Sequence, residues 1–458
     1  MCKRDKMKKV SLIFIAFAIV LFSSGCSNKT YTVEIHPKKE KNSIRRVALF
    51  LDGTANDFKS RTNISKLYNI IANQDLDNLY LFYNKGVGTD GKFIGAGTGF
   101  GIDKDVREAY EFLTLTYSLG SKIYLFGFSR GAYTARILAG MIQTVGIYDL
   151  KQLNKYDRKQ LIKKLYQAYK GKNKTKEIIQ KKANKVIQDY KTSTTIYQTY
   201  SANNNDKIIK MMGLWDTVEA LGVVSTIEAI KNKLGIEKDK QDITHPNNRY
   251  YDKICKVEYV FHALALDDNR ANVFTPIIMT DKDMITDCGN DEKNINISKV
   301  VTEVWFSGAH ADIGGGYDYD DNLSNENELS LSGVSLNWML KNISKVDRKL
   351  IPKNIKVYQD INGKIHNAES SIRPAYKKVN RVDILKKYLQ ESIYKKIKIH
   401  KSVIDRLKLK NRNGYDSKWY EFNSTNTDSQ SILLQKCFQI NKNILFKEKE
   451  CKFIEIIE

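Results

Sequence analysis

Short runs of apolar residues alternate with amphipathic segments along much of the chain. The runs at 47–51, 79–83 and 123–126 are dominated by apolar side chains, which is typical of strands buried on both faces of a sheet. Between the first two runs, apolar residues recur at helical spacing from Ile64 to Ile71. A strand, a helix and a second strand in this order form a right-handed unit with parallel strands. We therefore predict an α/β fold, with a mostly parallel sheet and helices on both of its faces.

Three further apolar runs, at 208–214, 257–266 and 300–306, continue the predicted sheet. An insertion at about 150–205 is rich in Lys and Tyr and follows a helical period. It is either a lid that faces lipid or a set of helices with a solvated basic face. Residues 346–458 are lysine-rich and show no motif, so they are predicted as a C-terminal extension of unknown role.

The run at 123–126 leads into a Gly-x-Ser-x-Gly pattern formed by Gly127, Ser129 and Gly131, and residues 133–142 continue as a helix with many small side chains. The bare pattern also arises by chance. A strand before it and a helix after it, however, are what a nucleophile elbow requires, because the serine must stand on a strained turn where its hydroxyl is accessible. Gly127 and Gly131 lack a Cβ and would let the strand and the helix approach closely. We therefore predict Ser129 as a nucleophile.

The oxyanion that forms when a serine attacks an acyl carbon needs nearby N–H donors. The amide of Arg130, directly after the serine, opens the predicted helix and is the expected first donor. Functional loops of parallel sheets lie at the carboxyl ends of the strands, and the run at 47–51 ends in Asp52-Gly53-Thr54. An amide of Gly53 or Thr54 is the candidate for the second donor, with an ordinary turn as the alternative.

A carboxylate and a histidine follow the serine, each at the end of a predicted strand. Asp216 follows the run that ends at 214, and His310 stands in a glycine-rich turn after the run that ends at 306. The order Ser129, Asp216, His310 is that of α/β-hydrolase triads, in which the histidine accepts the serine proton and the acid orients the histidine. His262 lies inside an apolar run, where a core role is expected. The other histidines, in a linker, in polar loops or in a charged region, are His36, His245, His366 and His400.

Two neighbouring carboxylates, Asp267 and Asp268, follow the run at 257–266 and compete for the role of the acid. Asp216 is the preferred candidate, but all three carboxylates stand at strand ends. The pattern alone therefore leaves the choice open. Asp312, close after the histidine, is a candidate for a supporting position beside the triad.

The beginning of the chain is predicted to be a targeting segment and not part of the fold. Basic residues at 2–9 precede an apolar run at 10–22, small residues and Cys26. This order resembles a bacterial lipoprotein signal, in which residues 1–25 are removed and Cys26 is lipidated. A plain secretory signal and an uncleaved anchor are the alternatives. Because Ser27 is not the aspartate associated with inner-membrane retention, we expect a lipid-anchored protein of the cell envelope, at the outer membrane.

Composition limits the classes of partner. Lys and Arg number 75 against 52 Asp and Glu, which gives a formal net charge of +23. The basic residues are scattered and form no basic arm, so nucleic-acid binding is not predicted, whereas contact with anionic phospholipid would be favoured. A disulfide between Cys437 and Cys451 is compatible with export, and the cysteines form no C-x-x-C pair. We predict neither a metal nor a cofactor.

A glycine-rich loop between Gly86 and Gly101 introduces nucleotide binding as an alternative. Its start satisfies G-x-G-x-x-G. Phe93, however, stands where a P-loop needs Ser or Thr, and glycines continue where a helix should begin. A loop that walls the active site is the better interpretation.

Several short motifs occur in the order of one known family. They are Leu51–Thr54, Gly86–Thr89, Leu125–Arg136, Trp215–Val218, His262–Asp267 and His310–Tyr317. In these motifs the chain resembles the α/β-hydrolase domain family that includes the type VI secretion phospholipase effectors, over about residues 45–343. The resemblance implies an α/β-hydrolase sheet and ester hydrolysis, of phospholipids in characterised members. It also implies that the catalytic serine, aspartate and histidine of the family fall on Ser129, Asp216 and His310.

The expected protein is a serine hydrolase that cleaves carboxylic esters through an acyl-enzyme, with a phospholipid bilayer or another acyl ester as its substrate. The alternative is a catalytically inactive, lipid-anchored binding protein on a hydrolase fold. The expected organisation is a signal at 1–25, a linker at 26–44, a hydrolase domain at 45–345 and the extension at 346–458.

Overall fold

The structure is a computed structural model. The residues that it describes are 31–53, 60–86, 100–171, 175–191, 196–201, 206–219, 250–270, 274–286, 288, 295–317, 330–368, 378–415, 417–421, 436–440 and 444–458. The predicted signal segment, Cys26, Thr54 and most of the glycine-rich loop lie outside the described residues.

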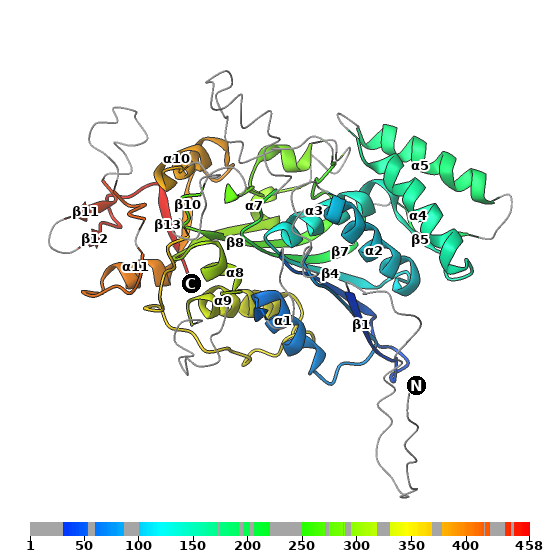
Figure 1. Cartoon of the computed structure of the whole chain (residues 1–458), viewed down its shortest axis with the longest axis horizontal. Coiled ribbons are helices and arrows are strands. Elements are labelled where there is room, and N and C mark those ends of the chain that lie inside the picture. Colours follow the sequence, from blue (N-terminus) through cyan, green and yellow to red (C-terminus); the bar gives the residue numbers. More distant parts are fainter. Residues whose placement is uncertain are drawn as a thin grey trace, which may run out of the picture.

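A nine-stranded sheet forms the centre of the described chain, in the order β1-β3-β2-β4-β7-β8-β9-β10-β13 (Figure 1). Neighbouring strands pair in parallel, except that β1 is antiparallel to β3. The predicted α/β fold with a mostly parallel sheet is therefore confirmed. The strands are β1 (Tyr31–His36), β2 (Arg46–Leu51), β3 (Leu79–Asn84), β4 (Lys122–Phe128), β7 (Ile209–Trp215), β8 (Val257–Ala265), β9 (Val301–Phe306), β10 (Ile397–His400) and β13 (Ile454–Ile457).

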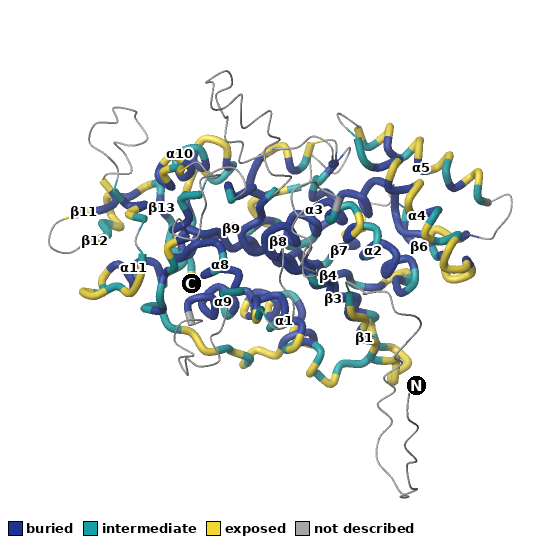
Figure 2. The backbone as a smooth tube through the Cα atoms, in the orientation of Figure 1, coloured by how far each residue is buried: buried dark blue, intermediate teal, exposed yellow. Residues whose placement is uncertain are grey.

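Helices cover both faces of the sheet. α1 (Asn63–Ala72) and α9 (Ser330–Val346) lie on one face, and α2 (Phe100–Thr116) and α3 (Arg130–Val145) lie on the other (Figure 1). Each face has its own hydrophobic cluster, one with the side chains of α1 and α9 and one with those of α2 and α3. The sheet is therefore buried on both sides (Figure 2), which explains why its strands read as nearly continuous apolar runs.

Strand β2 illustrates this two-sided burial. Ala48 and Phe50 belong to the cluster with α1 and α9, whereas Val47, Leu49 and Leu51 belong to the cluster with α2 and α3. Side chains of a strand alternate between the two faces, so both sets must be apolar. The carboxyl end of β2 is thereby fixed beside that of β4, with Leu51 paired to Gly127.

The described part of the insertion holds two helices, α4 (Lys155–Tyr169) and α5 (Lys176–Lys191). A short antiparallel pair, β5 (Ile147–Asp149) and β6 (Tyr197–Tyr200), closes its base. Both helices lie at one end of the molecule beyond α2, with exposed residues along their outer sides (Figure 2). The remaining short elements are η4 (Lys282–Ile285), α7 (Ile297–Val300), α8 (His310–Gly314), α10 (Arg381–Glu391), α11 (Lys401–Leu407), β11 (Phe438–Ile440) and β12 (Ile444–Phe446).

The structure revises two expectations about the segments that flank the predicted hydrolase domain. The segment predicted as a linker at 26–44 contains β1, an edge strand whose Val33 and Ile35 are partly exposed. An edge strand with polar residues between its apolar ones gives no continuous apolar run, so its pattern was missed. The extension at 346–458 supplies β10 and β13 to the central sheet and packs its own apolar cluster against β8 and β9.

Two disulfides join residues that are distant in sequence. Cys255 pairs with Cys288, and Cys437 pairs with Cys451, the pairing considered from the sequence. Within the described ranges, no helix is long and apolar enough to cross a membrane. The same residues contain no group of three or more His, Cys, Asp or Glu that could hold a metal ion.

A buried ion pair ties the start of the extension to the sheet. Arg46 on β2 binds the carboxylate of Asp347 through Nε at 2.9 Å and Nη2 at 3.2 Å, and the hydroxyl of Tyr124 on β4 also donates to Asp347. Burial acts to raise the pKa of Asp347, but these hydrogen bonds and the charges of Arg46 and Lys122 outweigh it, so the pKa lies below its ordinary value.

Replacing Asp347 by Asn should leave the Arg46 guanidinium buried without a counter-charge and lower the free energy of unfolding by about 3–5 kcal/mol at neutral pH. Urea unfolding followed by circular dichroism measures this. Asp383→Asn is the control, because Asp383 pairs with Lys386 on an exposed surface and its loss should cost about 1 kcal/mol or less. Equal effects of the two substitutions would contradict the structural role of Asp347.

Candidate active site

Ser129 lies on a sharp turn between β4 and α3. Its φ of 58° and ψ of −125° form a conformation that residues with a side chain rarely adopt. The neighbouring strand holds the turn in place, because the amide of Ser129 donates to the carbonyl of Trp215 at 3.0 Å. The hydroxyl is thereby presented at the carboxyl edge of the sheet, in the strand-turn-helix geometry of a nucleophile elbow.

The two flanking glycines are required by close backbone contacts. A Cβ on Gly127 would lie 2.5 Å from the Cα of Ala132, and a Cβ on Gly131 would overlap the carbonyl oxygen of Leu51. Neither obstacle is a flexible side chain that could move aside. The glycines therefore allow α3 to begin directly against β2 and β4.

Asp216 follows the last residue of β7 and is fully buried. Its backbone is strained, with a φ of 37°. The amide of Asp216 donates to the carbonyl of Ala263 at 2.7 Å, and its Oδ1 accepts from the amide of Ala265 at 3.0 Å. Both partners lie on β8, so the neighbouring strand fixes the carboxylate and leaves Oδ2 for another donor.

His310 connects the other two side chains. It is the first residue of α8, beyond the end of β9, and its Nδ1 lies 2.6 Å from Oδ2 of Asp216. Its Nε2 lies 2.8 Å from Oγ of Ser129. The structure thus brings together the three residues predicted as a triad, although 94 and 181 positions separate His310 from Asp216 and Ser129.

This hydrogen-bonded chain has one chemically consistent arrangement of protons. An ionised Asp216 only accepts, so Nδ1 of His310 carries a proton and donates it. The neutral Nε2 is then the acceptor for the hydroxyl hydrogen of Ser129. Such an arrangement can remove a proton from the serine as the serine attacks and can stabilise the imidazolium that forms.

Two aromatic rings hold the imidazole in this orientation. The ring of Phe128 lies 4.7 Å from that of His310, and the ring of Phe274 approaches it edge-on at 5.1 Å. The guanidinium of Arg270 covers Phe274 at 3.4 Å. The histidine is only 5% exposed, so packing as well as hydrogen bonds limits its rotation.

The structure describes two of the three candidate oxyanion donors, Arg130 and Gly53. Arg130 is the first residue of α3 and directly follows Ser129. The amide of Gly53, by contrast, donates to Oδ1 of Asp52 at 2.7 Å. This bond corrects the expectation for Gly53, because a donor held by a carboxylate is not directed at a substrate. Thr54 lies outside the described residues.

The competing carboxylates have other partners. Asp267 accepts from the amide of Gly308 at 2.7 Å, and Asp268 accepts from the amide of His310 at 3.1 Å. Burial acts to raise the pKa of Asp268, but hydrogen bonds from Arg270 and its positive charge outweigh this, so the pKa is lowered. Neither carboxylate contacts the imidazole ring in the described structure. Both fix the turn that carries His310.

Asp312, predicted to support the triad, holds the same turn from its other end. Its Oδ2 accepts from the amides of Ala309 and His366, and its Oδ1 lies 2.6 Å from Nδ1 of His366. The ring of His366 stacks on Tyr317 at 3.6 Å. The sequence had assigned His366 to a polar loop, and no local pattern links it to a site 54 residues away.

The C-terminal extension supplies further contacts that the sequence did not predict. The hydroxyl of Ser417 donates to Oδ1 of Asp267 at 2.9 Å, and Arg381 donates to the carbonyl of Asp268. Arg381 is buried on α10, and its positive charge lies near Asp216 as well as Asp267 and Asp268. The extension is therefore part of the wall that supports the site.

A family model described as "T6SS, Phospholipase effector Tle1-like, catalytic domain" matches residues 45–342. The chain belongs to this family. The resemblance predicted from the short motifs is confirmed: residues 45–342 form a Tle1-like domain. Among curated proteins, "Uncharacterized protein YEL023C" of Saccharomyces cerevisiae is 28% identical over 266 residues, which are 53% of this chain and 34% of the yeast protein. The chain thus spans about a third of the length of that relative.

Solved structures with some similarity include an uncharacterized protein from Pseudomonas aeruginosa, with a TM-score of 0.38, 14% identity and coverage of 69% of this chain and 48% of that one. The Tle1 effector bound to the VgrG spike gives a TM-score of 0.33 and 17% identity, covering 61% and 52% of the two chains. An esterase from the Planctomycetes species Thermogutta terrifontis gives 0.30 and 12%, covering 70% and 92%. With TM-scores this low, we base no argument on these structures.

Behind the elbow, the Tle1-like domain has a small cavity whose lining includes Asp52, Asp105 on α2 and Arg130. Burial raises the pKa of Asp105 to about 8, and the charge of Glu108 acts in the same direction. The hydrogen bond from Asn84 and the charges of Lys104 and Arg130 oppose this rise. Burial also lowers the pKa of Arg130 to about 10.

The raised pKa of Asp105 predicts a stability that falls as the pH rises. Between the ordinary value of 3.8 and about 8, the folded protein retains a proton that the unfolded chain has released. Asp105→Asn should remove this loss, so that it raises the midpoint of thermal unfolding more at pH 8 than at pH 4. Asp383→Asn, which removes an exposed carboxylate, is the matched control for the loss of an acidic side chain. An unchanged profile in Asp105→Asn would contradict the prediction.

Proposed function

We propose that the chain is a serine hydrolase that cleaves carboxylic esters through Ser129, His310 and Asp216. The observation that carries this proposal is the continuous hydrogen-bonded chain from Oγ of Ser129 through the imidazole to Oδ2 of Asp216. Membership of a phospholipase-related family supports the same chemistry.

In the proposed reaction, Nε2 of His310 takes the hydroxyl proton of Ser129 while Oγ attacks the acyl carbon. The tetrahedral intermediate collapses when the imidazolium gives that proton to the leaving alcohol, which produces an acyl-enzyme. Water then attacks the acyl carbon and gives its proton to Nε2. Collapse of the second intermediate releases the carboxylic acid and returns the proton to Ser129. Throughout the cycle, Asp216 holds Nδ1 and stabilises the positive ring.

The amide of Arg130 is the proposed donor to the oxyanion. It opens α3, where the partial positive charge of the helix end favours an anion. This amide belongs to the residue directly after the nucleophile. Of the two earlier candidates for the second donor, Thr54 is retained.

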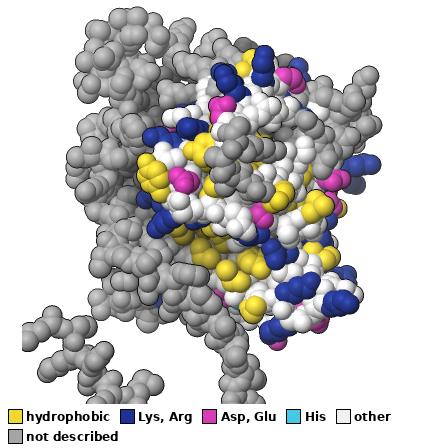
Figure 3. All heavy atoms as spheres, turned by 90° about the vertical axis from the view of Figure 1, so that its right-hand side faces the viewer, with side chains coloured by type: hydrophobic (Ala, Val, Ile, Leu, Met, Phe, Trp, Pro, Cys, Tyr) yellow, Lys and Arg dark blue, Asp and Glu magenta, His cyan; other side chains and the backbone are white. Residues whose placement is uncertain are grey.

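The proposed substrate is the acyl ester of a membrane phospholipid. Figure 3 views the end of the molecule that carries α4 and α5, and it shows Lys and Arg side chains scattered among hydrophobic ones. Tyr156 and Tyr197 in this region are 71% and 66% exposed, and the chain carries a formal net charge of +23. A basic surface with exposed aromatic residues favours contact with an anionic bilayer.

The competing proposal is an inactive binding protein that keeps the hydrolase fold. Ser129→Ala separates the two, because loss of the nucleophile should lower kcat/KM by about 10⁴-fold or more without unfolding the chain. The assays are the hydrolysis of p-nitrophenyl esters and the release of fatty acid from mixed phospholipid vesicles.

Ser298→Ala, at an exposed serine of α7, is the control and should keep wild-type activity. Activity on vesicles that disappears only in Ser129→Ala would support a phospholipase. Activity on soluble esters alone would contradict a membrane phospholipid as the substrate. Equal activity of Ser129→Ala and wild type would refute the triad.

We also propose that Cys26 carries a lipid anchor and that the mature protein resides at the outer membrane. Cys26→Ser should prevent incorporation of labelled palmitate when the protein is made in a bacterial host. Ser27→Asp should keep the lipid but shift the protein to the inner membrane. Palmitate labelling of Cys26→Ser equal to that of wild type would refute the anchor.

A further inference from the structure

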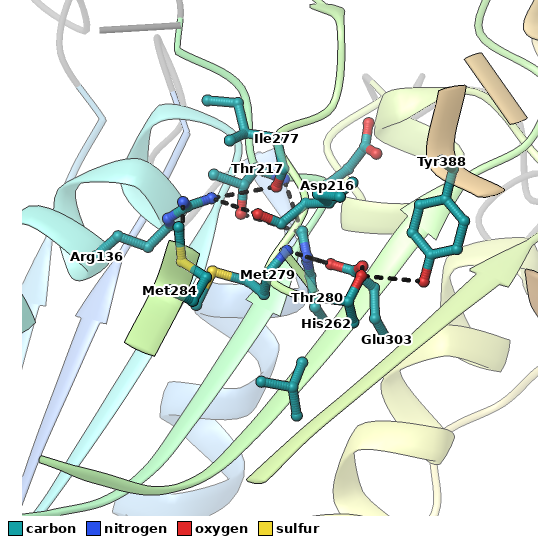
Figure 4. A network of polar contacts seen from close by, with 12 residues as sticks. Arg136, Asp216, Thr217, His262, Ile277, Met279, Thr280, Met284, Glu303 and Tyr388 are labelled. Carbon is teal, nitrogen blue, oxygen red and sulfur yellow. Dashed lines mark hydrogen bonds and ion pairs between the residues drawn. The ribbon is translucent and has the colours of Figure 1, made fainter. Parts of the chain in front are cut away.

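A fully buried histidine and glutamate lie beneath the turn that carries Asp216 and take no direct part in the triad. Nδ1 of His262 on β8 lies 2.7 Å from Oε2 of Glu303 on β9, and both side chains are 0% exposed. On its other side, Nε2 of His262 accepts from the amide of Thr217 at 3.1 Å and lies 3.1 Å from the hydroxyl of Thr217. Figure 4 shows this network beside Asp216.

The contacts specify which nitrogen of His262 is protonated. A backbone amide can only donate, so Nε2 must be an unprotonated acceptor for Thr217. The proton of the neutral ring is therefore on Nδ1, which donates it to Glu303. Glu303 thus selects the tautomer of His262 that Thr217 requires.

Glu303 is itself held by donors from a different segment. Its Oε2 accepts from the amide of Met279 at 2.8 Å, and its Oε1 accepts from the hydroxyl of Thr280 at 2.8 Å. The hydroxyl of Thr280 lies 3.4 Å from that of Tyr388 on α10 of the C-terminal extension. With the proton of His262, the carboxylate of Glu303 has three hydrogen-bond donors. These donors replace the water that the carboxylate loses when it is buried.

Hydrogen bonds hold both the amide and the carbonyl of Thr217. His262 accepts a hydrogen bond from the amide, and the carbonyl accepts one from the amide of Ile277 at 2.8 Å. The carbonyl of Ile277 in turn accepts from Nη1 of Arg136 at 3.2 Å, on the helix that begins at the nucleophile (Figure 4). The turn that contains Asp216 and Thr217 is therefore held between β8 and α3.

The amide of Thr217 belongs to the peptide bond that follows Asp216, so its direction sets the backbone of Asp216. With a φ of 37°, that backbone is strained and persists only if its surroundings hold it. If His262 offered no acceptor, the buried amide of Thr217 would lose its partner, and rotation of the peptide would relieve both this loss and the strain. Such a rotation would turn Oδ2 of Asp216 away from His310.

We propose that His262 and Glu303 are positioning residues that hold the Asp216 turn in its catalytic conformation. This inference rests on the proposed function of the triad. It gives His262, which the sequence assigned to the core, a role in the reaction through Thr217.

Two substitutions at His262 differ by one methylene and separate this role from simple packing. His262→Asn keeps an amide donor near Glu303 but does not reach Thr217. His262→Gln is long enough to offer its carbonyl oxygen to Thr217. Leu350→Ala removes a fully buried side chain outside the network and is the control for lost stability. Each full-length variant is assayed with a soluble p-nitrophenyl ester, and its thermal unfolding midpoint is measured.

We expect His262→Asn to lower kcat by about 10–100-fold with KM changed by less than about twofold, because substrate contacts remain while the base loses its orientation. His262→Gln should recover kcat to within about fivefold of wild type. Leu350→Ala should lower the unfolding midpoint and leave kcat of the folded protein unchanged. A kcat of His262→Asn within about twofold of wild type would overturn the proposal, as would equal losses in both His262 variants.

If His262→Asn does not fold, the tautomer of His262 in the wild-type protein is measured by ¹⁵N NMR of its ring nitrogens. The proposal requires a protonated Nδ1 and an unprotonated Nε2 that accepts from the amide of Thr217. A protonated Nε2 would overturn the proposal. Wild-type protein that is inactive on every ester would overturn the proposed function itself, which distinguishes that failure from a failure of the positioning role.

Discussion

The parallel pairing of β4, β7, β8 and β9 is the constraint on which the site depends. Parallel strands end at the same edge of a sheet, so the turns after these strands lie side by side although their residues are far apart in sequence. Ser129 follows β4, Asp216 follows β7 and His310 lies just beyond β9. β7 lies next to β4, whereas β8 separates β9 from β7. The segment after β9 therefore crosses the end of β8 to bring His310 to Asp216 and Ser129. The apolar faces of the strands, buried on both sides, keep this edge in register.

Buried carboxylates fix the loops at this edge. Each of them accepts a hydrogen bond from a backbone amide in or beside a turn, which satisfies a donor that the sheet leaves unpaired. Three of these amides, those of Gly308, Ala309 and His310, belong to the turn that carries the histidine. The edge is therefore rigid because negative charges and backbone donors are matched inside the protein. The carboxylates are Asp52, Asp216, Asp267, Asp268, Glu303 and Asp312.

The sequence predicted the parts of the molecule whose signals are local. The apolar runs predicted the central strands, and the glycines around Ser129 predicted the turn. Both signals lie within a few neighbouring residues of the chain. Strand β1 and the strands of the extension were missed. A short or half-exposed strand has no clear apolar run, and it is recognised only by its pairing with neighbouring strands. The contact of His366 with Asp312 depends on tertiary structure in the same way.

Reaction with a fluorophosphonate tests the central claim most directly, because such reagents modify only a serine that a neighbouring base activates. The purified protein is treated with the reagent, digested and mapped by mass spectrometry. The account predicts a single adduct on the peptide that contains Ser129, and strongly slowed labelling in Asp216→Asn. A modified serine elsewhere, or labelling of Ser129 at the same rate in Asp216→Asn, would contradict it.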